Sequence, residues 1–424
     1  MQLKRYEMTG KENVYALINL PGGNISIELY ETIDEALMLA AVNEAIRYHP
    51  LFGTRIVFEN GQYCFEENPE PPVIFNADDA PEIYGTAENH HYPWMLVIRD
   101  KQMVFYLTHA LTDGCGTFSF CKTVLHIYFR LSGAAFADTV TDFPMGSPAQ
   151  TMENAFRRYA DPACEPLCRP KPIQPVNIAP HCFASKDQRP WRLEIPLQEV
   201  RRFAKESETS IFSVIGCILA RSMADAFHIR SGNIYIRVPV NLRGVFPSVT
   251  DRNFVQGFSL CYMADRMNTM PDAKVETIFR SQLDLWTDKS NLTQFINADS
   301  DLLESSIADP AQFLRFTESE KAKDPTAEMV YTHITKPGFS EELMAKIRDI
   351  HIDANTIPDG LIFVSGVTIG TNVCLTILQC SRNDCFMDSL QKVLHRREIT
   401  HKLYQFDLPP ARSYRSTSDL AENG

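Results

Sequence analysis

The chain has 424 residues, of which 44% are hydrophobic and 22% are charged, a composition typical of globular proteins. Its length exceeds one ordinary domain, so we expect two lobes. The formal net charge of -12 argues against nucleic acid or an anionic membrane as the main partner, because both require a basic face. No apolar run reaches the roughly 20 residues of a membrane-spanning helix, and the N-terminus lacks a secretory signal, which favours a cytoplasmic location.

The first 160 residues predict an N-terminal lobe of strands and helices. Apolar periodicity, capping signals and the Asn60-Gly61 turn define its elements. His49, which precedes Pro50, is interpreted as bordering a helix. The expected elements are strands at 14–20 and 24–29, a helix from about 32 to 48, a hairpin of 53–58 and 62–65, strands at 94–98 and 103–107, and a helix ending near Ser132.

The stretch QMVFYLTHALTDGCGTFSF is the most informative part of this lobe. Its apolar run at 103–107 suits a strand covered on both faces, and His109 stands where that strand ends. Asp113 follows, and Gly114 and Gly116 are expected to permit a tight turn or a close approach where a Cβ would clash. The sequence therefore predicts a histidine at the end of a buried strand, before a helix.

A proline-rich stretch at 161–190 has little periodicity and predicts a crossover between the lobes. Residues 191–424 then form the expected C-terminal lobe. Its predicted elements are a strand at 191–195, helices at 197–205 and from about 209 or 210 onward, strands at 233–240, 361–365 and 372–379, and a helix at 387–394.

The eleven cysteines are an odd number and lie partly in apolar stretches, which indicates reduced thiols packed in the core. Cys164, Cys168, His181 and Cys182 have approximately the spacing of a zinc site, but the prolines between them are unsuited to a compact finger. We predict no metal site. Cys115 is interpreted as a small residue in a tight turn, because no base accompanies it.

The spacing of His109, Asp113 and Gly114 resembles the His-x-x-x-Asp-Gly signature of one acyltransferase superfamily. That superfamily contains chloramphenicol acetyltransferase, plant acyltransferases, peptide-synthetase condensation domains and alcohol acetyltransferases. Condensation domains usually carry a second histidine where this chain has Thr108, and the late Asp-Phe-Gly-Trp-Gly element of the plant branch is missing. Both differences point toward the alcohol acetyltransferase branch.

Two later segments support the resemblance. The sequences Val-Asn-Leu-Arg at 240–243 and Arg-Asn-Phe at 252–254 resemble a strand end and a returning loop of alcohol acetyltransferase-like proteins. The Thr-His-Ile at 332–334 stands, more loosely, where those proteins have Ser-Asn-Leu. The three segments fall in the order of the family, and with the closing hairpin and helix expected at 361–394 the resemblance spans nearly the whole chain. The resemblance implies a two-lobe α/β fold of mixed, mostly antiparallel sheets with helices, and an active-site channel between the lobes.

The resemblance also implies transfer of an acyl group from a thioester to a hydroxyl acceptor. The expected donor is acyl-CoA, a co-substrate, and no bound cofactor is predicted. One alternative is condensation with a carrier-bound acyl thioester and an amine, in which case an acyl carrier protein is a partner. Another is a non-catalytic binding protein of the same fold.

Such a transfer needs a base, because a neutral hydroxyl is a weak nucleophile. Imidazole is suited to this task at neutral pH, so His109 is assigned as the general base. Asp113 either orients His109 or pairs with an arginine and braces the loop. The family favours bracing, with Arg243 as the first choice of partner, ahead of Arg252 and Arg237.

The tetrahedral intermediate needs hydrogen-bond donors at its oxyanion. Thr332, Asn253 and Ser259 are candidates by position, and the sequence does not choose among them. Taken individually, each is better explained as a satisfied polar residue at a strand end. His333 is interpreted as an ordinary core or surface histidine close to the lobe interface.

Overall fold

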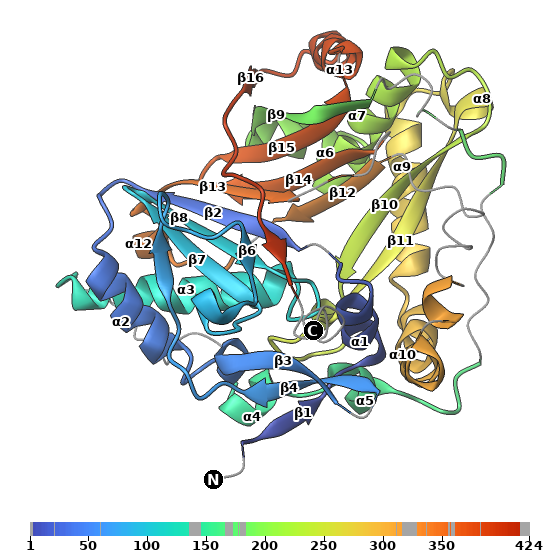
Figure 1. Ribbon diagram of the computed structural model, residues 1–424. Helices are drawn as coiled ribbons and strands as arrows, with labels where there is room; N and C mark the ends of the chain where they lie inside the picture. Colours follow the sequence, from blue (N-terminus) through green and yellow to red (C-terminus); the bar gives the residue numbers. More distant parts are fainter. Residues whose placement is uncertain are drawn as a thin grey trace.

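The computed structural model has a mixed α/β architecture, as the sequence predicted (Figure 1). Most strand pairs are antiparallel, which confirms the expected fold class. The described residues are 3–20, 22–59, 61–134, 146–165, 173–176, 178, 184–310, 312–315, 329–335, 337–354, 357, 361–381 and 383–415, with no description of the side chains at 184–189, 380 and 381.

A five-stranded sheet and a three-stranded sheet dominate the N-terminal half. The strand orders are β13-β2-β8-β7-β5 and β1-β4-β3. The strands of this half and of its small parallel pair are β1 (Arg5–Glu7), β2 (Gly23–Leu29), β3 (Thr54–Glu59), β4 (Gln62–Glu67), β5 (Ile74–Asn76), β6 (Ile83–Tyr84), β7 (Trp94–Arg99), β8 (Gln102–Leu107), β13 (Ile347–Ala354) and β17 (Ser413–Tyr414). The helices are α1 (Gly10–Leu17), α2 (Glu35–Ala45), α3 (Gly114–Leu131), α4 (Pro148–Thr151) and α5 (Ala155–Tyr159), with short 3-10 turns at Pro50–Gly53 and Ala87–Asn89.

A seven-stranded sheet of order β11-β10-β12-β14-β15-β9-β16 forms the C-terminal half. Its strands are β9 (Ala184–Pro196), β10 (Asn233–Asn241), β11 (Val255–Met263), β12 (Met329–Ile334), β14 (Ile362–Ile369), β15 (Asn372–Ser381) and β16 (Lys402–Gln405). The helices are α6 (Leu197–Glu206), α7 (Ile211–Ala226), α8 (Ala264–Met267), α9 (Asp272–Trp286), α10 (Lys289–Ala308) and α13 (Cys385–Arg396), with a 3-10 turn at Leu242–Gly244. The short helix α12 (Glu341–Met344) packs instead against the N-terminal core through Leu343. Apolar side chains of α7, α9 and α13 form one core with one face of this sheet.

The two halves exchange elements late in the chain. Strand β13 pairs antiparallel with β2 and so extends the N-terminal sheet, and β17 pairs with β6. The division into an N-terminal lobe at 1–160, a linker at 161–190 and a C-terminal lobe at 191–424 remains a proposal. Strands β13 and β17 come from the last of these segments but pair with strands of the first.

Most of the predicted elements are confirmed, but the strand expected at 14–20 is wrong. This segment belongs largely to helix α1. The Thr9 hydroxyl accepts a hydrogen bond from the Glu12 N–H, and the Glu12 carboxylate accepts one from the Thr9 N–H. This capping box starts a helix ahead of the apolar residues that suggested a strand. The hairpin of β3 and β4 is confirmed, and Asn60 of its turn lies outside the described residues.

Within the described ranges, no single helix is both long and apolar enough to cross a membrane, although the bent pair of α6 and α7 meets the length and composition test together.

Candidate active site

His109 follows β8, which lies between β2 and β7 in the N-terminal sheet. The residues at 103–107 are buried, whereas His109 itself is partly exposed. Helix α3 begins five residues later, and Asp113 caps it by accepting a hydrogen bond from the Gly116 N–H at 3.0 Å. The strand end and the helix start therefore fix the turn that carries His109.

The Asp113 carboxylate joins this turn to the loop between β10 and β11, residues 242–254. Its Oδ2 accepts hydrogen bonds from Arg243 Nη1 and from the Phe254 N–H, both at 2.8 Å. Its Oδ1 is used by the helix cap. Among the described residues, the Asp113 carboxylate thus forms hydrogen bonds with the loop and with α3, and none of these hydrogen bonds reaches the His109 ring. This geometry matches a brace more closely than a triad.

Arg243 is itself held by the loop it joins. Its Nε donates to the Thr250 carbonyl at 3.0 Å, and its Nη2 donates to the Arg252 carbonyl at 2.7 Å. The side chain is 12% exposed. Arg243 therefore fixes the loop backbone and Asp113 at the same time.

Three consecutive loop residues reach three parts of the site. Arg252 pairs with the fully buried Glu12 of α1, with Nε 3.1 Å from Oε1. The Asn253 side-chain amide donates to the His109 carbonyl at 3.1 Å. The Phe254 N–H binds Asp113, as described above. The loop therefore holds α1, the histidine backbone and the start of α3 together.

The surroundings of His109 favour a neutral ring at neutral pH. Burial lowers the pKa of His109 below its ordinary value of 6.5, although a hydrogen bond with the backbone of Thr112 and the charge of Asp113 raise it. The charge of Lys11 lowers the pKa further. The ring of Tyr15, from α1, lies beside the imidazole with centroids 6.1 Å apart. A neutral imidazole in this position can accept a proton.

A second buried network lies behind the turn, and sequence reasoning missed it. His49 Nδ1 lies 2.8 Å from Asp251 Oδ2, and His49 Nε2 lies 2.8 Å from Thr123 Oγ1. Burial raises the pKa of Asp251, and the His49 ring offsets only part of that rise. The Asp251 carbonyl also accepts a hydrogen bond from the Thr112 hydroxyl. His49 was expected only to border a helix, and no local pattern links it to a partner 202 positions away.

The two glycines of the motif differ. A Cβ at Gly116 would lie 2.2 Å from the Asp251 carbonyl oxygen and 2.2 Å from Thr112 Oγ1, so only glycine permits this approach. At Gly114 a Cβ would meet only Ile334 Cδ1, at 3.6 Å, which is ordinary contact. The expected clash at Gly114 is therefore wrong, because the space beside it is open apart from Ile334.

One face of the C-terminal sheet is directed toward this turn. Side chains alternate along strands, so Thr332 shares a face of β12 with Ile334, which packs against the N-terminal core. Arg237 and Ser259 are direct partners on β10 and β11, and Gly257 shares their face. We call this set, Arg237, Gly257, Ser259, Thr332 and Ile334, the inner face.

Of the three oxyanion candidates, two therefore lie on the inner face and one in the loop. Ser259 and Thr332 are partly exposed, whereas Asn253 is buried and its amide is engaged with the His109 carbonyl. His333 points to the other face of β12, where its ring nitrogens lie 3.2 Å from the Tyr331 hydroxyl and 3.3 Å from Thr368 Oγ1. Burial lowers the pKa of His333 to about 4.

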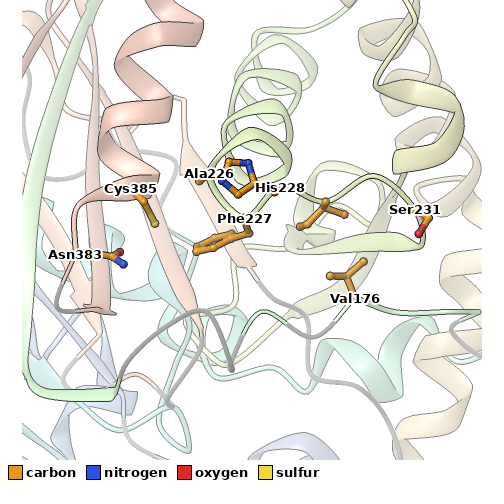
Figure 2. Close-up of a pocket in the computed structure, with 8 residues that line it drawn as sticks. Val176, Ala226, Phe227, His228, Ser231, Asn383 and Cys385 are labelled. Atoms are coloured by element: carbon orange, nitrogen blue, oxygen red, sulfur yellow. The ribbon is translucent and has the colours of Figure 1, made fainter.

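A cavity of about 550 Å³ lies elsewhere, between the end of α7 and the start of α13 (Figure 2). None of its lining residues is a predicted site residue. Its walls come from Val176, Ala226, Phe227, His228, Ile229, Ser231, Asn383 and Cys385. Among the described residues no three His, Cys, Asp or Glu side chains converge as metal ligands, and three members of the zinc-like cluster, Cys168, His181 and Cys182, lie outside them.

No family model and no curated protein matches this chain, but solved structures do. TRI101 of F. sporotrichioides, complexed with coenzyme A and T-2, is 10% identical with a TM-score of 0.60, over 94% of this chain and 99% of that chain. TRI3 trichothecene 15-O-acetyltransferase from Fusarium sporotrichioides is 9% identical with a TM-score of 0.60, over 93% and 95%. The condensation domain of the monacolin K polyketide synthase MokA is 11% identical with a TM-score of 0.57, over 93% and 98%.

These likenesses concern the fold. They cover nearly the full length of both chains in each case. The two-lobe fold of acetyltransferases and condensation domains, which the motifs predicted, is thereby confirmed for this chain.

Proposed function

We propose that this chain is an acyltransferase that moves an acyl group from acyl-CoA to a hydroxyl acceptor, with His109 as the general base. One observation carries the proposal. A partly exposed imidazole, with its pKa lowered by burial, stands at the end of β8 on a turn that Asp113, Arg243 and Asn253 hold in place. A base with this protonation state and a fixed backbone is what the reaction requires.

In the proposed reaction His109 takes the proton of the acceptor hydroxyl as its oxygen attacks the thioester carbonyl. A C–O bond forms and the tetrahedral intermediate collapses with cleavage of the C–S bond. The imidazolium then returns its proton to the departing thiolate. No bound cofactor is needed, because the thioester itself supplies the activated acyl group.

The supporting roles follow from the contacts. We assign Asp113 and Arg243 to bracing the turn, since both carboxylate oxygens are already used. Gly114 leaves open space beside the base. Asn253 holds the His109 backbone, so the hydroxyls of Ser259 and Thr332 on the inner face become the preferred donors to the oxyanion.

The choice of donor rests on the comparisons. TRI101 has this fold and was solved with coenzyme A, which supports a free acyl-CoA donor for this chain. MokA supplies a condensation domain of the same fold, which keeps the carrier-bound thioester as the second candidate.

Thiol release from a panel of acyl-CoAs with pooled alcohols and amines tests the proposal. We expect acceptor-dependent release, and a decrease of roughly 10²–10⁴-fold in His109→Ala. His395→Ala, which removes an exposed histidine from helix α13, is the matched control and should behave as wild type.

The other outcomes would each contradict the role of His109 or select one of the alternative functions. Equal activity of wild type and His109→Ala would show that His109 is not the base. Silence with acyl-CoA but turnover with a loaded carrier protein would select the condensation-type alternative. Silence with both donors would favour a non-catalytic binding protein of this fold.

A further inference from the structure

Arg237 is the charged member of the inner face. It pairs in register with Ser259 on β11 and with Val330 on β12, so its side chain projects from the same face as theirs. The opposite face of β10 is filled, because Ile236 and Val238 belong to the core formed with the helices. Figure 1 shows β10 and β11 extending toward α1.

Two observations place Arg237 near His109. The ring of Tyr15 lies beside the His109 ring, with centroids 6.1 Å apart. Burial raises the pKa of Tyr15, the charge of Arg237 lowers it, and the charge of Asp113 raises it. Tyr15 therefore lies within reach of both the guanidinium and the turn that carries the base.

Arg237 differs from the other arginines of the hairpin in having no acidic partner. None of the ion pairs in the part of the chain that the structure describes includes it, and its side chain is exposed. Its guanidinium lies over Gly257, where a Cβ would come within 3.0 Å of Nε and 3.1 Å of Nη2. The glycine thus leaves room for the guanidinium to lie against the strand, and within the described residues no ion pair occupies its donors.

We infer that Arg237 binds an anionic group, a carboxylate or a phosphate, of a substrate of the acyl transfer proposed above, on which this inference rests. A planar guanidinium can bind both oxygens of such a group at once. In a chain of net charge -12, an exposed arginine on the inner face that has no ion pair among the described residues also supplies local positive charge. The anion belongs either to the phosphates of coenzyme A or to a carboxylate of the acceptor.

The first arm of the test measures binding by calorimetry. Coenzyme A and pantetheine, which lacks the phosphates, are titrated into wild type, Arg237→Gln and Arg237→Lys. If the phosphates bind Arg237, we expect the Kd of coenzyme A to rise by about 10- to 100-fold in Arg237→Gln while that of pantetheine changes little. Arg237→Lys keeps the charge without the fork and should lie between the two.

The second arm measures acyl transfer from acetyl-CoA to short hydroxy acids and to their methyl esters. If an acceptor carboxylate binds Arg237, Arg237→Gln should lower kcat/KM for the acids by about 10- to 100-fold relative to the esters. Gly257→Ala should lower kcat/KM for the acids by a smaller factor, because the added Cβ forces the Arg237 guanidinium to move. Arg230→Gln removes another exposed arginine, before β10 and outside the inner face, and is the matched control.

The outcomes separate the two sources. A loss confined to coenzyme A assigns a phosphate, and a loss confined to the hydroxy acids assigns a carboxylate. Equal losses for charged and neutral partners, or no loss in either arm, would overturn the inference. If wild type binds coenzyme A but transfers no acyl group, the proposed function fails, and the calorimetric comparison alone then decides about Arg237. If wild type neither binds coenzyme A nor transfers an acyl group, the inference about Arg237 is contradicted as well.

Discussion

The β10–β11 hairpin uses arginine in two different ways. At its loop end, Arg252 is buried and Arg243 is half-buried, and both form hydrogen bonds, with Asp113, Glu12 and loop carbonyls. On its strands, Arg237 is exposed and lies over a glycine. The loop end therefore holds the candidate base in place, and the strand part is left for a ligand.

The difference is also one of energetics. A buried ion pair gains little net stability over an apolar pair of the same shape, but an unpaired buried charge is costly. The loop end thus fixes the position of the candidate base, and substitutions there should lower stability. Substitutions on the strand part should leave stability unchanged and weaken only ligand binding. Substitutions at the loop end and on the strands should therefore differ in their effects on stability and on ligand binding.

Arg252→Met is expected to have the largest effect on stability. It leaves the Glu12 carboxylate, which is fully buried, without its charge partner, and the free energy of unfolding should fall by ~3–5 kcal/mol. Urea denaturation measures the loss. Arg237→Gln is the internal control and should change the same quantity by less than ~0.5 kcal/mol. Similar losses in both variants would erase the distinction between the loop end and the strands.

Asp113→Asn tests what the carboxylate does for His109. The change weakens hydrogen bonds to the Arg243 guanidinium and to α3, and we expect a stability loss of ~1.5–3 kcal/mol. The charge of Asp113 raises the pKa of His109, so its removal should move the acid limb of the kcat/KM profile to lower pH. A rate loss of roughly 10⁴-fold with an unmoved profile would instead indicate a triad-like role.

Gly116→Ala and Gly114→Ala form a matched pair on the same turn. A Cβ at Gly116 would overlap the Asp251 carbonyl, which should cost ~1–3 kcal/mol of stability. A Cβ at Gly114 has room at the start of α3, so this variant should keep its stability or gain up to ~1 kcal/mol. The two melting temperatures, compared with wild type, measure the difference. Equal destabilisation would contradict the distinct environments of the two glycines.

The sequence predicted what neighbouring residues determine. The strand that ends at His109, the helix that begins at Gly114 and the hairpin of β3 and β4 all follow from local periodicity and turn chemistry. The pairing of Asp113 with Arg243 was preferred from the family resemblance, since their separation of 130 positions leaves no local signal.

What the sequence missed depends on distant partners. Glu12 meets Arg252 across 240 positions, and His49 meets Asp251 across 202 positions. Both pairs involve the loop between β10 and β11, and no sequence motif predicts either pair. The segment 14–20, which overlaps helix α1, was predicted as a strand from its apolar residues, and that error concealed the place of Tyr15 beside His109.

The pH dependence of stability should show a smaller effect, from His333. His109 on its turn and His333 on the other face of β12 are both partly exposed, and burial lowers the pKa of each, to about 4 for His333. Between pH 6.5 and about 4 the unfolded chain binds a proton at His333 that the folded chain does not. The free energy of unfolding should therefore fall as pH decreases through this window, by at most about 1.4 kcal/mol per pH unit from this residue.

Urea denaturation of wild type and His333→Asn between pH 4.5 and 8 isolates the contribution of His333, since other titrating groups are common to both. The stability difference should be constant above pH 6.5 and should move steadily toward the variant below it. A difference that stays constant over the whole range would mean that burial does not lower the pKa of His333.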